Sequence, residues 1–300
     1  MLTGVHILLT YTCSYECDHC FLHCSPRASG TFTVGQLRSL FDEIDTLGTV
    51  TSVYFEGGES FLYYPLLVEG IRLARARDWE VGIVTNGYWA TSVEDAQLWL
   101  KPLHQLGIAD LSVSNDEFHH SGDGPNRAEI AYAAATDMGM SPSTIRIEPA
   151  TILLHSQEDI AKGEPVIGGD VKLTGRAAEK LTDGLPRRSW ESMTTCPREE
   201  LEHPKRVHVD AFGHVHMCQG LSMGNMWETP LSELVTNYRA QDHPISGPLV
   251  NGGPAELARR YGITHDNEYV DECHFCYMLR KTIIDQFPQY LAPRLVYGFE

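Results

Sequence analysis

Short apolar runs alternate with longer amphipathic segments along the first half of the chain. The apolar runs have the length and composition of β-strands and lie at residues 5–11, 52–56, 80–85, 110–114 and 144–149, with a weaker one at 171–174. Strand-like runs that alternate with helix-like segments are typical of βα units around a parallel sheet. We therefore predict an α/β fold for this half.

The segments between these runs carry local signals for helices. Thr33 precedes a segment whose apolar residues recur every three or four positions, which predicts an N-cap and an amphipathic helix. Pro65 suits the first turn of the next helix. Ser92 and Asp95 approximate a capping box for a third helix, and a fourth is expected over 128–138.

Six βα-like repeats are too few for an eight-stranded barrel and predict a partial (β/α)6 TIM-like barrel. In sheets of this kind, the loops at the carboxyl ends of the strands form the working face. Side chains that directly follow a predicted strand are therefore candidates for binding or catalysis.

The pattern changes in the second half. Residues 155–170 are polar and predict a long loop, and the stretch from 177 to 190 is a plausible domain boundary. We expect a barrel domain over 1–180 and a small α+β domain with the C-terminal tail over 181–300.

Within this second domain, alternating residues on both sides of Gly213 predict a β-hairpin over 206–218. A short helix is expected at 231–238. Residues 243–253 are rich in proline and glycine and are expected to be irregular.

Composition and charge limit the classes of function. The chain of 300 residues is 42% hydrophobic and 9% aromatic, which suits a globular protein with a sizeable core. A net charge of −17 disfavours a nucleic-acid partner. No secretory signal is visible, and no apolar stretch approaches the about 18 residues that a membrane span needs. We expect a cytoplasmic protein without a membrane partner.

The eight cysteines fall into two groups, at 13, 17, 20 and 24 and at 196, 218, 273 and 276. In a reducing compartment, such cysteines are metal ligands or reactive thiols more often than disulfides. The long cysteine-free middle predicts two separate sites.

The first group contains the motif Cys13-Ser-Tyr-Glu-Cys17-Asp-His-Cys20. Three thiols at this spacing can hold one face of an iron–sulfur cube, whose fourth iron then stays open for another ligand. The motif directly follows the first predicted strand and so belongs on the working face. From the spacing alone, a zinc knot or a redox-sensitive trio is an alternative.

A second motif, Gly57-Gly58-Glu59, follows the second predicted strand. Two glycines let a ligand approach the backbone, where N–H groups and one carboxylate can hold a small polar molecule. A tight turn without a ligand is the alternative for this motif taken alone.

Together, the two motifs resemble those of the radical S-adenosylmethionine (radical SAM) enzymes, and the resemblance covers about residues 5–176. It implies a [4Fe-4S] cluster on Cys13, Cys17 and Cys20 that binds SAM through its open iron. Reductive cleavage of SAM then yields a 5′-deoxyadenosyl radical, which abstracts a substrate hydrogen.

The resemblance also assigns roles to residues around SAM. Gly57, Gly58 and Glu59 are expected to hold its ammonium group. Further contacts are expected from Asn86, Ser114 and Asp116, although an Asn-Gly turn and a helix cap are alternatives for these positions. Two positions depart from the usual family pattern: His19 stands where tyrosine or phenylalanine is common beside adenine, and Ser60 stands where proline is common.

The late cysteines, Cys196, Cys218, Cys273 and Cys276, together with the predicted hairpin resemble the auxiliary-cluster extensions called SPASM and Twitch domains. Four cysteines suit the Twitch type, with one auxiliary [4Fe-4S] cluster that relays or accepts an electron. A structural zinc ion on four cysteines is the competing interpretation.

Four further residues have two interpretations each. Cys24 is either a hydrogen-atom donor or a core residue. His119 and His120 are either acid–base groups or solvated loop residues. Arg176 either holds SAM or a substrate anion, or is an exposed turn residue.

The sequence thus predicts a radical SAM oxidoreductase that acts on a small molecule or a peptide and receives electrons from a reductant such as ferredoxin or flavodoxin. The alternative is a non-catalytic iron–sulfur or zinc protein in electron transfer or assembly. No residue pattern identifies the substrate.

Overall fold

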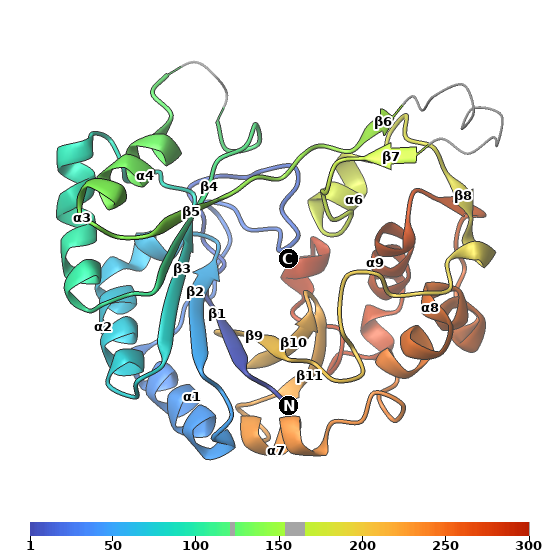
Figure 1. Ribbon diagram of the computed structural model, residues 1–300. Coiled ribbons are helices and arrows are strands. Elements are labelled where there is room, and N and C mark those ends of the chain that lie inside the picture. The colour runs from blue at the N-terminus through green and yellow to red at the C-terminus, as the bar shows by residue number, and fades with distance from the viewer. Residues whose placement is uncertain (121–123, 154–165, 300) are drawn as a thin grey trace.

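A single twisted sheet organises the fold (Figure 1). The structure is a computed structural model that describes residues 1–120, 124–153 and 166–299. The strand order is β11-β10-β9-β1-β2-β3-β4-β5. In chain order the strands are β1 (Gly4–Thr10), β2 (Ser52–Gly57), β3 (Glu80–Thr85), β4 (Asp110–Ser114), β5 (Pro142–Ile145), β9 (Arg206–Asp210), β10 (His214–Cys218) and β11 (Leu221–Asn225).

Strands β1 to β5 run parallel, which confirms the predicted α/β fold with a partial barrel-like sheet. Strand β9 pairs in parallel with the other edge of β1. Strands β10 and β11 continue the sheet in antiparallel fashion. The predicted hairpin is confirmed, since β9 and β10 are its two strands.

The four predicted helices of the first half are present. They are α1 (Val34–Leu47), α2 (Tyr64–Arg75), α3 (Val93–Gln105) and α4 (Arg127–Asp137). Thr33 forms a reciprocal capping box with Gln36, and Ser92 accepts a hydrogen bond from the backbone N–H of Asp95. These caps satisfy backbone donors that the first helical turn leaves free.

Alternation along the strands separates two faces of the sheet. Val5, Ile7 and Leu9 of β1 are fully buried in the large apolar core, together with apolar residues of α1 to α4. The residues between them, including His6 and Leu8, point to the opposite face because successive side chains of a strand alternate. In Figure 1, α1 to α4 lie outside the parallel strands, and α6, α8 and α9 lie across from them.

One predicted strand is wrong. Residues 171–174 form no strand, and the sixth parallel strand is β9 instead. Val207 and Val209 of β9 are fully buried in the core, whereas His208 and Asp210 alternate with them. A pairing between segments some 200 positions apart leaves no local signal in the sequence, which explains the error. The domain division after residue 180 stays a prediction, although strands from both sides of it share one sheet.

The expectation of irregular structure at 243–253 is also wrong for most of that segment. Helix α8 (Ser246–Tyr261) covers it, with a break at Gly252 and Gly253 where the backbone leaves helical angles. The short helix α7 (Leu231–Asn237) agrees with prediction. Of the predicted polar loop, residues 155–165 lie outside the described residues, and 166–168 form a short strand.

The remaining elements are short, apart from α9 (Glu272–Thr282). They comprise β6 (Thr151–Leu153), β7 (Val166–Gly168), α6 (Arg176–Lys180), β8 (Arg188–Ser189), β12 (Glu268–Tyr269) and four 3-10 turns, η1 (Ser60–Tyr63), η2 (Trp190–Ser192), η3 (Ile284–Gln286) and η4 (Arg294–Tyr297). Within the described ranges, no helix combines the length and apolar character needed to cross a bilayer.

The break in α8 gives a test of the fold. Gly253 has φ of 62° and ψ of −162°, and a Cβ there would lie 2.4 Å from backbone atoms of Thr194 and Thr195. Gly253→Ala should therefore lower the free energy of unfolding by roughly 1–3 kcal/mol for backbone strain, with a further loss from the clash. Chemical denaturation followed by circular dichroism measures this change.

Gly262→Ala is the matched control. Gly262 also has a positive φ, of 57°, but a Cβ there meets nothing within 4 Å. It should cost only about 1–2 kcal/mol, the ordinary penalty of a left-handed residue. Equal losses in the two variants would contradict the close approach of α8 to residues 194–195.

Candidate functional site

The first cysteine group lies in a loop that leaves the carboxyl end of β1, as predicted. Cys13 and Cys24 are buried, and Cys17 and Cys20 are partly exposed. Burial raises the pKa of the Cys13 thiol to about 11 and that of Cys17 to about 12. A hydrogen bond with the neighbouring Cys24 thiol lowers the pKa of Cys20 to about 6. The loop therefore presents three thiols, which must release their protons when a metal binds.

Arg176 holds this loop in place. Its backbone N–H donates to the carbonyl of Cys20 (3.0 Å), its Nε to that of Cys17 (2.8 Å) and its Nη2 to that of Cys24 (2.6 Å). Arg176 is 6% exposed. The alternative of an exposed turn arginine is wrong. Two of its guanidinium nitrogens are thus engaged by the loop. A contact of Arg176 with SAM stays a prediction.

The glycine turn packs against the end of β1. The N–H of Gly58 donates to the carbonyl of Thr10 (2.7 Å), and the N–H of Glu59 donates to that of Thr12 (3.0 Å). A Cβ at Gly58 would lie 2.2 Å from the carbonyl oxygen of Thr12. The glycine is required by this close approach of two backbones. These two N–H groups are engaged within the protein, so any ligand contact of Gly57, Gly58 and Glu59 must come from other atoms.

The carboxylate of Glu59 is fully buried and organises the neighbouring strand end. It accepts hydrogen bonds from the Thr85 hydroxyl (2.9 and 3.1 Å), the Asn86 N–H (2.8 Å) and the Phe61 N–H (3.0 Å). Burial raises the pKa of Glu59 to about 7. Glu59 thereby ties the end of β3 to the glycine turn after β2.

Asn86 connects this turn to the cysteine loop. Its Nδ2 donates to Ser14 Oγ (3.1 Å) and to Cys13 Sγ (3.6 Å), and its Oδ1 accepts from the N–H of Tyr88. Asn86 thus serves as the predicted turn residue and also touches a candidate cluster ligand. The structure brings together the ends of β1, β2 and β3 at one edge of the sheet.

A cavity of about 290 Å³ opens beside this edge. Its walls include Asn86, Ser114, His119, His120 and residues 124–128. Pockets for small ligands begin at about 300 Å³, so the volume approaches that of a small-molecule site. Of the predicted SAM contacts, the cavity is lined by Asn86 and Ser114.

Asp116 and His19 lie together next to the cavity wall. His119 Nδ1 lies 2.7 Å from Asp116 Oδ1, and Asp116 Oδ2 accepts from the N–H of Ile147. The ring of His19 is tilted against that of Phe118, with centroids 4.4 Å apart, and lies edge-on to that of His119, with centroids 5.0 Å apart. Burial lowers the pKa of His19 to about 4. Contacts of SAM with these two residues stay predictions.

The four late cysteines come together although they lie up to 80 positions apart. Cys196, Cys218, Cys273 and Cys276 line one small pocket, with Cys273 and Cys276 on α9. Lys172 Nζ lies 3.6 Å from Cys218 Sγ and donates to Glu199 (2.6 Å). Arg280, 1% exposed, also lines the pocket. Two cations therefore stand beside these thiols, where they would stabilise thiolate charge.

The spacing of the four late sulfur atoms bears on which metal they could hold. Within the described ranges, three groups of potential ligands have all their donor atoms within 4.8 Å of one another, and none contains a cysteine. Four thiolates bound to one zinc ion at 2.3 Å would lie about 3.8 Å apart. The late sulfurs are thus spread more widely than a single zinc ion would hold them.

Sequence reasoning missed Lys172 and Arg280. Arg280 lies four positions after Cys276 on a helix, a spacing that places both on one face and was available as a signal. Lys172 had no such signal, because only the tertiary fold brings it to Cys218. Cys24 belongs to the buried apolar cluster under the loop, as its core interpretation expects.

A parallel sheet with three thiols after its first strand and a glycine turn after its second defines the class of a radical SAM domain. Residues 7–147 match the family model described as "Radical SAM superfamily". This part of the chain is a radical SAM domain.

Three curated proteins are similar to the chain over part of its length. The "Putative peptide biosynthesis protein YydG" of Bacillus subtilis (strain 168) is 30% identical over 38% of this chain and 36% of its own. The "S-adenosylmethionine-dependent nucleotide dehydratase" of Selenomonas ruminantium is 30% identical over 53% and 60%. The "Antilisterial bacteriocin subtilosin biosynthesis protein AlbA" of B. subtilis (strain 168) is 32% identical over 38% and 25%. In each case the match spans less than two thirds of the relative.

Among solved structures, that of BtrN in complex with AdoMet and 2-DOIA is similar, with a TM-score of 0.52. The match has 17% sequence identity and covers 79% of this chain and 83% of that chain. At this identity the similarity concerns the fold.

The role of Arg176 gives a test of the site. Arg176→Met should remove two charge-assisted hydrogen bonds to the cysteine loop, each worth roughly 1.5–3 kcal/mol. We expect the reconstituted protein to lose loop-bound iron to a chelator about tenfold faster than the wild type. Iron and sulfide per chain, measured over time after anaerobic reconstitution, check this.

Lys180→Met is the matched control, because Lys180 binds Asp18 of the same loop (2.6 Å) through side chains that are about half exposed. Such a surface pair contributes about 0–1 kcal/mol. Iron loss as fast in Lys180→Met as in Arg176→Met would refute the role given to Arg176.

Proposed function

We propose that the protein is a radical SAM enzyme with a second iron–sulfur cluster, and that it modifies a peptide. The observation that carries the proposal is the meeting of the cysteine loop, the glycine turn and the cavity at one edge of the sheet, with Asn86 in contact with both loop and cavity. When bound, a [4Fe-4S] cluster and SAM supply hydrogen-atom abstraction from an unreactive C–H bond.

In this proposal, Cys13, Cys17 and Cys20 hold the first cluster, and Arg176 fixes the backbone that carries them. The cavity next to Asn86 and Ser114 takes SAM. His119 and His120, on the cavity wall, face the bound molecules and restrict the entry of water. The buried Glu59 keeps the ends of β2 and β3 together, so that the cavity wall keeps its shape.

The late cysteines hold the auxiliary [4Fe-4S] cluster. Their wide spacing supports a cluster over one zinc ion, and Lys172 and Arg280 offset part of its negative charge. With four protein ligands, no iron of a bound cluster would stay open for substrate, and the chemistry that the cluster would supply is electron transfer. The electrons come from a reductant such as ferredoxin or flavodoxin in the cytoplasm.

A peptide substrate is supported by the names of two similar proteins, which refer to peptide and bacteriocin biosynthesis. A small-molecule substrate is the second candidate, supported by the similar nucleotide dehydratase. Deuterium labelling separates the two candidates. Each candidate substrate is labelled with deuterium, and only the true substrate transfers deuterium into 5′-deoxyadenosine.

The experiment that tests catalysis is the cleavage of SAM. The protein is reconstituted anaerobically, supplied with SAM and dithionite, and analysed for 5′-deoxyadenosine by mass spectrometry. We expect its formation. If none forms while iron and sulfide counts show intact clusters, the alternative of a non-catalytic iron–sulfur or zinc protein holds.

Two cysteine variants test the division of labour. Cys17→Ala should abolish SAM cleavage, because it removes a ligand of the first cluster. Cys273→Ala should leave part of the cleavage but uncouple it from product, because only the second site is damaged. The same complete loss of 5′-deoxyadenosine in both variants would contradict separate roles.

A further inference from the structure

The face of the sheet opposite α1 to α4 carries a group of polar residues that the proposed function does not use. His6 of β1, Glu56 of β2 and His208 of β9 come from three adjacent strands. The registers place His6 beside His208 and Leu8 beside Glu56. Three neighbouring strands hold these side chains with little freedom, which is the rigidity that a binding site needs.

Two imidazole nitrogens point at one carboxylate oxygen in this group. His6 Nδ1 lies 3.2 Å and His208 Nε2 lies 3.0 Å from Glu56 Oε1. Hydrogen bonds do not satisfy every polar atom of this group. Within the described residues, His6 Nδ1 is buried and has no hydrogen-bond partner of acceptable geometry. The ring of His6 is fixed by stacking on Tyr54, with centroids 4.9 Å apart.

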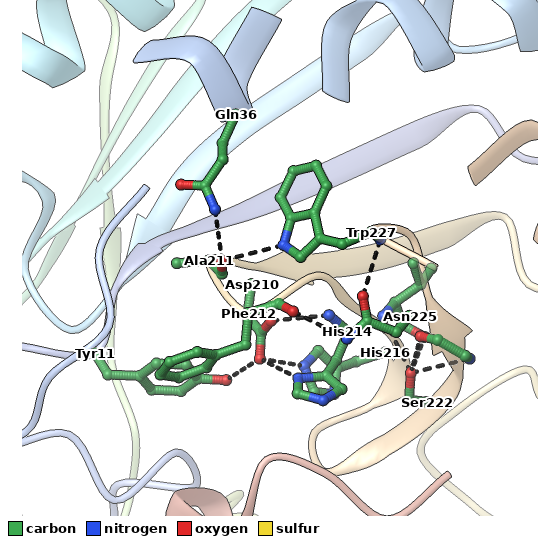
Figure 2. A network of polar contacts seen from close by, with 12 residues as sticks. Tyr11, Gln36, Asp210, Ala211, Phe212, His214, His216, Ser222, Asn225 and Trp227 are labelled. Atoms are coloured by element: carbon green, nitrogen blue, oxygen red, sulfur yellow. Dashed lines mark hydrogen bonds and ion pairs between the residues drawn. The ribbon is translucent and has the colours of Figure 1, made fainter. Parts of the chain in front are cut away.

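A neighbouring group provides the contrast (Figure 2). The fully buried Asp210 Oδ2 lies 2.9 Å from Tyr11 Oη, 3.1 Å from His214 Nδ1 and 3.2 Å from His216 Nε2, and all three contacts have hydrogen-bond geometry. The backbone N–H of His214 binds the other carboxylate oxygen (2.9 Å). These hydrogen bonds satisfy both carboxylate oxygens of Asp210, whereas His216 Nδ1 is buried without a partner among the described residues. The group joins β9 and β10 to the residue after β1.

We propose that His6, Glu56 and His208 form a binding site for a divalent transition-metal ion such as Zn²⁺. Zinc binds imidazole nitrogen at about 2.0–2.1 Å and carboxylate oxygen at about 2.0–2.2 Å, so tetrahedral ligands lie about 3.3–3.5 Å apart. The observed separations of 3.0 and 3.2 Å need only a small expansion to admit the ion. Two histidines and one carboxylate are a common ligand set for such ions.

Two of the three side chains of the site are partly exposed to solvent. The side chains of His6 and Glu56 are 15% and 19% exposed, whereas that of His208 is 7% exposed. Three protein ligands leave a fourth position on the ion for water or for an anionic group such as a carboxylate or phosphate. The proposal concerns metal binding alone and does not depend on the radical SAM reaction.

Zinc binding to the protein with its clusters in place tests the proposal. Reconstituted protein is incubated anaerobically with one equivalent of Zn²⁺, desalted and analysed by mass spectrometry for metals. We expect about one zinc per chain. X-ray absorption at the zinc edge should show nitrogen and oxygen neighbours at about 2.0–2.1 Å; a sulfur shell at about 2.3 Å would place zinc at cysteines and overturn the proposal.

Variants locate the site. His208→Gln and Glu56→Gln should each weaken zinc binding by more than about a hundredfold, beyond the roughly 10–100-fold cost of removing an outer-shell partner. His214→Gln, the same change in the Asp210 group, should retain zinc. No retained zinc in the wild type, or equal loss in His214→Gln, would overturn the proposal. If His208→Gln does not fold, the loss of zinc binding in His6→Gln and the X-ray absorption spectrum of the wild type still test the site.

Discussion

The pairing of β1 on both of its edges is the constraint on which the structure depends. Strand β2 binds one edge and β9 the other, so three distant parts of the chain meet around one strand. The cysteine loop leaves the end of β1, the glycine turn leaves the end of β2, and β9 leads into the hairpin that ends at Cys218. Because parallel strands end at the same edge of a sheet, this pairing alone brings the first two motifs together.

Three carboxylates that are wholly or largely removed from water show three different solutions to one energetic problem. A carboxylate removed from water must be matched by donors or by a cation. Glu59 is matched by backbone and hydroxyl donors, and its pKa is still raised by burial. Asp210 is matched by a tyrosine, two imidazoles and a backbone N–H. Glu56 has two imidazole nitrogens directed at one oxygen, at 3.2 and 3.0 Å.

The sequence was sufficient to predict those parts of the structure that local residue patterns determine. The first four strands and the capped helices follow from apolar periodicity and from residues such as Thr33 and Ser92, and the position of the cysteine loop follows from the first strand. The fifth strand was predicted at 144–149 and lies at Pro142–Ile145 instead. The sequence was insufficient where distant segments meet. Nothing near residue 206 indicates that β9 pairs with β1, and nothing near Lys172 or Arg176 indicates their contacts with cysteine sulfur and loop carbonyls. In α8, packing overrides the weak helix propensity of its glycines and proline.

The tie between Arg176 and the cysteine loop also has a consequence for the order of events during synthesis. The carbonyl groups of Cys17 and Cys24 find their guanidinium partner 159 and 152 positions later in the chain. Domains form from the N-terminus as the ribosome proceeds, at about 5–20 residues per second. The loop thus stays without its anchor for roughly 8–30 seconds after it emerges, and its thiols remain accessible to carriers and oxidants throughout that interval.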